Sequence, residues 1–89
     1  MRAIVFVIGA DRVGIIADVC CLLASMNINI LDINQTVMKG TFTMTMLVDT
    51  ELASEPYEYI HEALHNKGEE IGLSIRIQRE DIFHAMHRI

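Results

Sequence analysis

The residues best suited to bind a small ligand lie in a short segment bounded by glycines, Gly9-Ala10-Asp11-Arg12-Val13-Gly14. Gly14 has no side chain, so the backbone there can approach a ligand closely. If a helix follows, its first N–H groups and the positive end of its dipole suit an anion such as a carboxylate. The glycines could instead serve only to turn the chain, and the dinucleotide pattern G-x-G-x-x-G is absent. Asp11 and Gly14 are therefore candidate ligand-binding residues, with a plain turn as the alternative.

A second candidate is the pair of amides Asn27 and Asn29, on either side of Ile28. An Asn side chain both donates and accepts hydrogen bonds, so it can meet a ligand's carboxylate or its ammonium group. The alternative is structural: Asn27 ends a helix and Asn29 lies in the turn into a strand. Both interpretations stay open from the residues alone.

The remaining reactive side chains do not predict catalysis or a metal centre. His61 and His65 are four residues apart, and His84 and His87 are three apart, so each pair could share a helix face. No third ligand has compelling spacing, and both stretches should be exposed. No nucleophile with a base and no acid–base pair stands out. We expect no metal, no cofactor and no enzymatic activity.

Secondary structure must hold these candidates in place. The β-branched and aromatic residues over 2–8 predict a strand that is apolar on both faces, as in a central strand covered on both sides. Helical spacing over 14–26 predicts a helix with Asp11 as its N-cap. The remaining predictions are strands over 27–38, 41–48 and 73–78 and a second helix, capped by Ser54 and by Gly68 and with Pro56 at its first position.

The apolar residues of the strand over 27–38 do not alternate regularly between its two faces. Ile28 and Ile30 lie on one face, whereas Leu31 and Ile33 lie on the other. Because side chains alternate with a period of two, this pattern requires either a bulge or burial of both faces.

The order β-α-β-β-α-β predicts an α+β, ferredoxin-like sandwich. Right-handed crossovers place both helices on one face of a four-stranded antiparallel sheet with strand order 4-1-3-2. The second strand then lies at an edge, where its unpaired N–H and C=O groups invite another chain. We therefore expect a homodimer.

Composition narrows the class of function. The chain has 89 residues, enough for one domain, and 52% of them are hydrophobic, which suggests apolar surface for a partner chain. A net charge of −5 argues against nucleic-acid binding. Neither a signal peptide nor a membrane span is indicated. Cys20 and Cys21 are adjacent, so a mutual disulfide would be strained, and we expect reduced thiols and a cytoplasmic protein.

Two segments together resemble a known family. The run Asp11-Arg12-Val13-Gly14-Ile15-Ile16-Ala17, then an amphipathic helix and Asn29-Ile30-x-x-Ile33-x-Gln35, is similar to the ACT domain, a regulatory ligand-binding module. Residues 32–37, Phe42-Thr43-Met44 and the tail Ile82-Phe83-x-Ala85-Met86 resemble the narrower group of stand-alone single-ACT-domain proteins of bacteria and archaea. The resemblance covers nearly all of residues 1–89 and implies one ACT-like domain.

The resemblance implies a function and a location for the site. In ACT domains a small ligand, often an amino acid, commonly lies between two subunits and touches the loop after the first strand and the start of the second. Those positions here are Asp11, Gly14, Asn27 and Asn29. Many ACT domains regulate an attached enzyme, so a separate partner enzyme or regulator is implied here. The alternative is an interaction scaffold that binds no metabolite and acts through its dimer or sheet surface.

Two spatial predictions follow. The first loop and the start of the second strand lie at opposite ends of the first helix, about 18 Å apart for twelve residues at 1.5 Å rise. One amino acid cannot span that distance, so we expect a second subunit, related by a two-fold axis, to complete the site. The tail over 80–89 carries Ile82, Phe83 and Met86, which predicts a short helix packed on its own sheet or on the partner.

Overall fold

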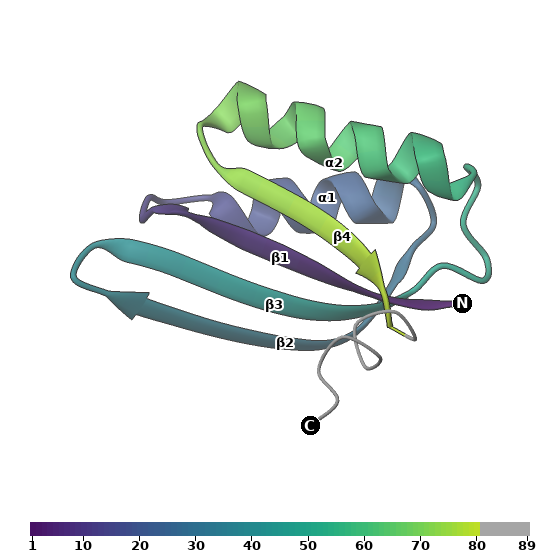
Figure 1. Ribbon diagram of the computed structural model, residues 1–89, viewed down its shortest axis with the longest axis horizontal. Helices are drawn as coiled ribbons and strands as arrows, with labels where there is room; N and C mark the ends of the chain where they lie inside the picture. The colour runs from purple at the N-terminus through teal and green to yellow at the C-terminus, as the bar shows by residue number, and fades with distance from the viewer. Residues whose placement is uncertain (81–89) are drawn as a thin grey trace.

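The computed structural model describes residues 1–80, whose strands and helices follow the predicted order (Figure 1). The elements are β1 (Arg2–Ala10), α1 (Ile15–Ser25), β2 (Asn29–Met38), β3 (Thr41–Asp49), α2 (Tyr57–Ile71) and β4 (Ser74–Arg79). No helix among these residues is long and apolar enough to cross a membrane. The tail helix was predicted over 80–89, and of this segment only Glu80 is among the described residues. Its apolar residues Ile82, Phe83 and Met86 lie outside them.

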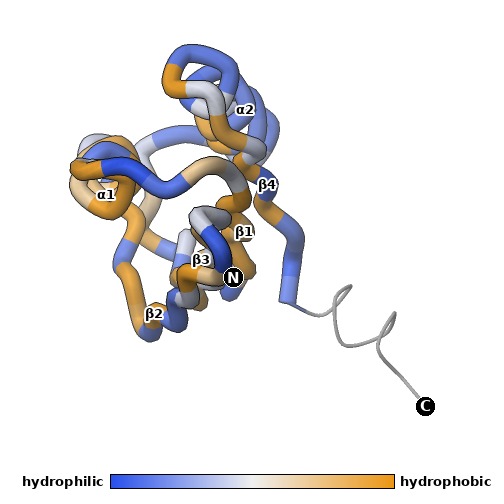
Figure 2. The backbone as a smooth tube through the Cα atoms, turned by 90° about the vertical axis from the view of Figure 1, so that its left-hand side faces the viewer, coloured by the Kyte–Doolittle hydropathy of each residue, from blue (hydrophilic) through white to orange (hydrophobic). Residues whose placement is uncertain are grey.

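The sheet has the predicted topology. Its strand order is β2-β3-β1-β4, and all three neighbouring pairs are antiparallel. Both helices lie on one face of this sheet, as Figure 2 shows. The predicted ferredoxin-like βαββαβ sandwich is therefore confirmed, with β1 and β3 in the middle and β2 at an edge.

The core forms between this face and the helices. Successive side chains of a strand point to opposite faces, so every second residue of β1 and β3 enters the core. Its buried members include Ala3, Val5 and Val7 of β1, Phe42, Met44, Met46 and Val48 of β3, Ile15, Val19 and Leu23 of α1, Ile60 and Leu64 of α2, and Ile75 and Ile77 of β4. The clean alternation predicted over 41–48 is confirmed.

The other face of β1 is covered less than predicted. Ile4 is buried and Phe6 is half-buried, but Ile8 is 51% exposed. Both helices pack on the opposite face, so they give this side of the strand no cover. The central position of β1 is confirmed, and within residues 1–80 the expected cover on both faces is only partly present.

A β-bulge explains the irregular apolar pattern of β2. Ile30 pairs with Val48 and Asp32 pairs with Leu47, so Leu31 is the extra residue. The pairing then resumes with Ile33 opposite Met46. Because of the inserted residue, Ile30 and Ile33 lie on the same face despite their odd spacing. Of the two alternatives that the sequence left open, the bulge is the one observed.

The start of α1 differs from the prediction. The helix begins at Ile15, and Gly14 occupies the N-cap position with φ +94°, in the left-handed region that favours glycine. Asp11, predicted as the cap, lies three residues earlier, and no side chain caps this end through a hydrogen bond. The backbone N–H of Asp11 donates instead to the carbonyl of Gly40, 2.9 Å away.

The ends of α2 also differ from the prediction. Pro56 is the N-cap and not the first helical residue, and no side chain, Ser54 included, caps this end by a hydrogen bond. The helix continues past Gly68 to Ile71, and Gly72 is the C-cap with φ +76°. Gly68 lies inside the helix, where an added Cβ would be 2.5 Å from the carbonyl oxygen of Leu73. This glycine allows α2 to pack closely on β4.

Candidate ligand-binding site

The β1–α1 loop is braced by its own side chains. The Arg12 guanidinium lies 2.7 Å from the Asp18 carboxylate in the first turn of α1 and donates to the carbonyl of Val13 at 2.8 Å. The carbonyl of Gly14 accepts from the backbone N–H of Asp18 at 2.9 Å. Arg12 therefore offsets the charge of Asp18, which lies beside the free N–H groups and partial positive charge of the first turn of α1.

A hollow of about 570 Å³ opens beside this loop and is called the Gly14 hollow here. Its volume lies within the range of roughly 300–1,000 Å³ that is usual for small-molecule sites. The lining includes Asp11 and Gly14 from the loop, Ile16 from α1, and Gln35 and Val37 from β2. A carboxylate at the helix start and an apolar group against Ile16 and Val37 would both fit this lining.

A second hollow, of about 420 Å³, lies at the other end of α1 and is called the Asn29 hollow. Its lining includes Asn27 and Asn29 as well as the acidic residues Asp49 and Glu51. Asn27 has φ +58°, and its Nδ2 donates to the carbonyl of Leu52 at 2.7 Å, so this amide joins the end of α1 to the β3–α2 loop. Asn29 is exposed at the first position of β2.

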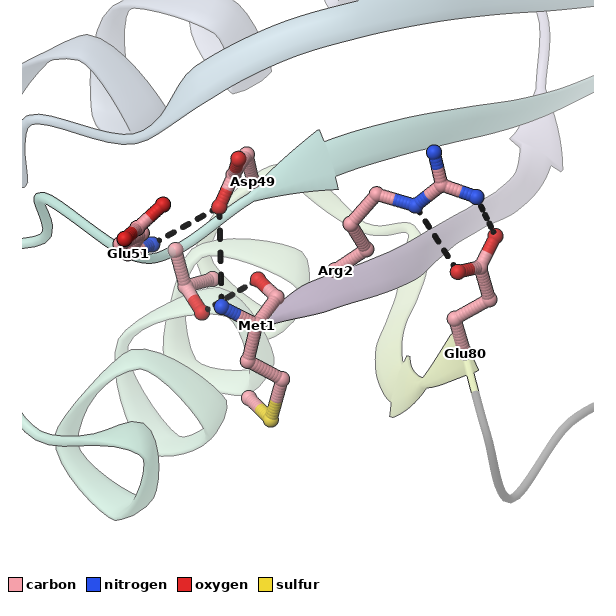
Figure 3. Close-up of polar contacts among 6 residues, drawn as sticks. Met1, Arg2, Asp49, Glu51 and Glu80 are labelled. Atoms are coloured by element: carbon pink, nitrogen blue, oxygen red, sulfur yellow. Dashed lines mark hydrogen bonds and ion pairs between the residues drawn. The ribbon is translucent and has the colours of Figure 1, made fainter.

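The carboxylates of the Asn29 hollow give it a negative character. An oxygen of Asp49 lies 3.7 Å from the terminal ammonium of Met1 and accepts from the backbone N–H of Glu51 at 2.9 Å (Figure 3). The same carboxylate therefore already attracts one ammonium group. A ligand's ammonium would find a similar environment beside Asn29.

One chain does not bring the four predicted site residues together. Asp11 and Gly14 line one hollow, Asn27 and Asn29 line the other, and the two linings share no residue. The 11 residues of α1 separate them, a length of about 16 Å at 1.5 Å per residue. Gln35, Val37 and Asp49 were not singled out from the sequence, because only strand pairing places them beside these residues.

Several exposed apolar residues lie on β2 and on the nearby start of α1 and are called the β2 flank here; two of them, Ile16 and Val37, also line the Gly14 hollow. Six of the ten large apolar residues that are exposed in the described chain belong to this flank, and they come from the β1–α1 loop, α1 and β2. They are Val13, Ile16, Leu31, Ile33, Val37 and Met38. Ile33 and Val37 pair with the core residues Met46 and Phe42 and so lie on the helix side of β2, whereas Met38 pairs with Thr41 on the other side. Exposed apolar residues on an edge strand are typical of a contact with another chain.

Two neighbouring cysteines lie on α1. Cys20 is half-buried and Cys21 is exposed, and both are free thiols. Burial raises the pKa of the Cys20 thiol, and the neighbouring Cys21 raises it further. A raised pKa keeps this thiol protonated at neutral pH, and the thiolate is the nucleophilic form.

The two histidines of α2 belong to a metal-binding pattern that the sequence reasoning did not identify. His61-Glu62-Ala63-Leu64-His65 matches the pattern H-E-x-x-H, which in zinc proteases places two metal ligands on one helix face. Such a centre needs a third protein ligand. Within residues 1–80 no group of three or more His, Cys, Asp or Glu residues could hold a metal ion, and His65 Nε2 lies 3.7 Å from a Glu69 oxygen. The described residues thus do not build the zinc site that the pattern suggests.

The sequence and the fold match a known family. A model of the ACT domain matches residues 2–78, so the chain belongs to the ACT domain family. Within that family it is similar over its whole length to a UPF0237 protein of Listeria innocua, with 48% identity over 89 residues and complete coverage of both chains. A UPF0237 protein of Methanopyrus kandleri is also 48% identical, over 88 residues that cover 99% of this chain and 98% of the relative.

Solved structures agree with this assignment. An ACT domain protein from Streptococcus pneumoniae superimposes with a TM-score of 0.83 and 36% identity, and the match covers 98% of each chain. The regulatory subunit of aspartate kinase from Thermus thermophilus matches with a TM-score of 0.69 and 28% identity, over 89% of this chain and 51% of that one. ACT domains are typically small-molecule regulatory modules, and this chain has their architecture throughout β1–β4.

Proposed function

We propose that this protein is a regulatory module that binds an amino acid or a similar small metabolite between two copies of itself. The observation that carries the proposal is the placement of two hollows at opposite ends of α1, with the exposed apolar residues of the β2 flank along the same edge strand. The protein itself is proposed to be non-catalytic and cytoplasmic, and a partner enzyme or regulator would respond to the bound state.

A two-fold axis can join the two hollows. If the β2 edges of two copies pair antiparallel, the Asn29 end of one strand lies against the Met38 end of the other. Gln35 and Val37, close to that Met38 end, line the Gly14 hollow. The Asn29 hollow of one copy would therefore meet the Gly14 hollow of the other, and each dimer would hold two shared sites.

The chemistry of the combined site suits a zwitterion. The α1 N-terminus at Gly14 would receive the ligand's carboxylate, because its free N–H groups and dipole favour an anion. Asn29 of the second copy, with Asp49 beside it, would accept from the ammonium group. Neither hollow alone has both groups so placed, so loss of the dimer should also cause loss of the ligand.

A thermal-shift screen of the proteinogenic amino acids tests this function. A ligand that binds only the folded state, present at 100 times its Kd, adds about 2.7 kcal/mol to the free energy of unfolding. For a domain of this size that corresponds to a rise in Tm of roughly 10–20 °C. No shift with any amino acid would contradict the proposed ligand class.

Site variants identify the position of the ligand. Gly14→Val should abolish the ligand-induced rise in Tm, because it adds bulk at the start of α1. Asn29→Ala should weaken ligand binding by about 0.5–1.5 kcal/mol, the usual contribution of one hydrogen bond. Gly72→Val is the matched control for the first variant, since Gly72 also has positive φ and nothing lies within 4 Å of its added Cβ. Asn66→Ala controls for the second, because Asn66 is an exposed amide on α2.

The alternative is an interaction scaffold that uses the same apolar surface without a metabolite. Two contacts favour it. The Asn27 Nδ2 already donates to the carbonyl of Leu52, and Arg12 is paired with Asp18, so fewer polar groups are left for a ligand. A dimer whose Tm responds to no amino acid, and whose β2 flank binds a second protein, would favour the scaffold.

A further inference from the structure

A trough, called the β4 trough here, runs along the outer side of the edge strand β4. The strand order β2-β3-β1-β4 gives β4 a neighbouring strand on one side only within residues 1–80 (Figure 1). The trough has a volume of about 930 Å³, and the five consecutive residues 74–78 of β4 line it. Phe6 and Ile8 of β1 and the α2 residues His61 and His65 complete the lining. The trough therefore follows the strand and is not formed around a single side chain.

Backbone groups of β4 are directed into this trough. In an antiparallel sheet, the residues of a strand direct their N–H and C=O groups alternately to one side and to the other. The pairing with β1, from Ala3 with Arg79 to Ile8 with Ser74, uses one side of β4. Over 74–77, alternate residues direct their N–H and C=O groups to the other side. An extended segment laid in the trough would pair with these groups as a fifth strand.

The side chains that line the β4 trough favour an acidic segment. Arg76 lies in it, and within residues 1–80 its guanidinium makes no hydrogen bond or ion pair. Among the same residues no Asp or Glu lines the trough, whereas the linings of the Gly14 hollow and the Asn29 hollow both include carboxylates. His65 already lies near Glu69, so Arg76 is the main group for a carboxylate in a chain of net charge −5.

A second copy of the chain suits this edge poorly. The segment Ser74–Arg79 contains two arginines and no acidic residue. If two β4 edges paired about a two-fold axis centred on Arg76, the two guanidiniums would lie directly opposite each other. Like charges in that position destabilise a strand pair, whereas a carboxylate opposite Arg76 would stabilise it. The edge therefore favours a strand from a different, acidic chain.

We propose that β4 binds an extended acidic segment of another protein, which joins the sheet as a fifth strand. A carboxylate of that segment lies opposite Arg76, on the face of the sheet away from the helices. Because side chains alternate, the residues on either side of it face α2, beside the buried Ile75 and Ile77. The segment recognised thus has an apolar-acidic-apolar pattern. The β2 edge, on the opposite side of the sheet, stays available for the proposed dimer.

Four labelled peptides test this inference by fluorescence polarisation with the full-length protein. The first has the sequence Thr-Val-Glu-Val-Thr, and the second has Lys in place of Glu. The third and fourth repeat the first with N-methyl groups on the backbone nitrogens of either the two Val residues or the Thr and Glu residues. We expect the Glu peptide to bind several-fold more tightly than the Lys peptide. Only one N-methylated peptide should lose binding, because only alternate N–H groups of an added strand face β4.

A reversal of charge locates the contact. Arg76→Glu should weaken binding of the Glu peptide several-fold and strengthen binding of the Lys peptide. Lys39→Glu is the matched control, because Lys39 is exposed in the turn between β2 and β3 and the change in charge is the same. It should leave both affinities unchanged. Circular dichroism and the melting curve establish that each variant is folded.

Four results would overturn the inference. Absence of binding, or equal binding of the Glu and Lys peptides, would remove the acidic partner. Full binding of both N-methylated peptides would show a contact between charges without an added strand. Equal effects of Arg76→Glu and Lys39→Glu would show attraction to the overall charge of the protein. Conversion of a homodimer to a monomer by the Glu peptide in size-exclusion chromatography would assign the β4 edge to a second copy.

Discussion

Gly68→Ala gives a direct measure of how closely α2 packs on β4. An added Cβ would lie 2.5 Å from the carbonyl oxygen of Leu73 and 3.2 Å from the backbone nitrogen of Ile75. Both atoms belong to the backbone, so no flexible side chain can move aside and the helix itself must shift. Overpacking of this kind costs about 1–3 kcal/mol, and we take the upper end because the clash is with backbone.

A gain in helix propensity partly offsets this cost. Gly to Ala in a helix interior stabilises by about 0.8–1.0 kcal/mol, which leaves a net loss of about 2 kcal/mol. At about 4–8 °C per kcal/mol, Tm should fall by roughly 8–16 °C. Thermal unfolding followed by circular dichroism measures the change. Asn66→Ala, at an exposed α2 position, should leave Tm unchanged or slightly raised; an unchanged or higher Tm for Gly68→Ala would refute the packing argument.

Three further outcomes follow from the structure. Ile33→Asp on the β2 flank should convert a dimer to a folded monomer in light scattering, because a charge would be buried in the contact; an unchanged mass would exclude this flank. Met46→Ala in the core should destabilise by about 2–5 kcal/mol in denaturant unfolding, since Met46 is fully buried, and a smaller loss would mean that the core collapses around the gap. Burial raises the pKa of Cys20, so the folded state holds this proton more tightly than the unfolded state. The resulting stabilisation is complete below the pKa of the thiol in the unfolded state and is lost as the pH rises through its pKa in the folded state. The free energy of unfolding should therefore fall at alkaline pH, and Cys20→Ala should remove that fall. An identical dependence of the unfolding free energy on pH in the variant would contradict the assignment.

The fold could be predicted because its strongest signals are local. Over 41–48 the core residues Phe42, Met44, Met46 and Val48 recur with a period of two, and the helices carry apolar residues at helical spacing. Topological rules then leave few arrangements for β-α-β-β-α-β. The bulge at Leu31 was recognised only as one of two solutions, since the register depends on which β3 residue faces each β2 residue.

The helix ends were harder to predict because one residue type serves several purposes. Gly14 and Gly72 adopt positive φ at helix ends, whereas Gly68 provides room for β4 inside a helix. Composition does not distinguish a glycine needed for its backbone angle from one needed for its small size. Asp11 has the chemistry of an N-cap, but the chain turns at Gly14 instead.

The site could be predicted only in part. Asp11, Gly14, Asn27 and Asn29 follow from chemistry and from the ACT resemblance, and the structure places them at the two ends of α1, as the sequence argument required. Gln35 and Val37 enter the Gly14 hollow through the pairing of β2 with β3, which no local pattern reveals. That these groups form one site remains a proposal.

Subunit complementation tests the shared site most directly. Gly14→Val and Asn29→Ala proteins are mixed in equal amounts, unfolded and refolded together, and titrated by calorimetry with the amino acid that the thermal-shift screen selects. In a mixed dimer one site carries both changes and the other carries neither. Half of the dimers should be mixed, so binding should return at about a quarter of the sites with the affinity of the natural protein. If no binding of natural affinity returns while mass spectrometry shows mixed dimers, each site lies within one subunit and the account is contradicted.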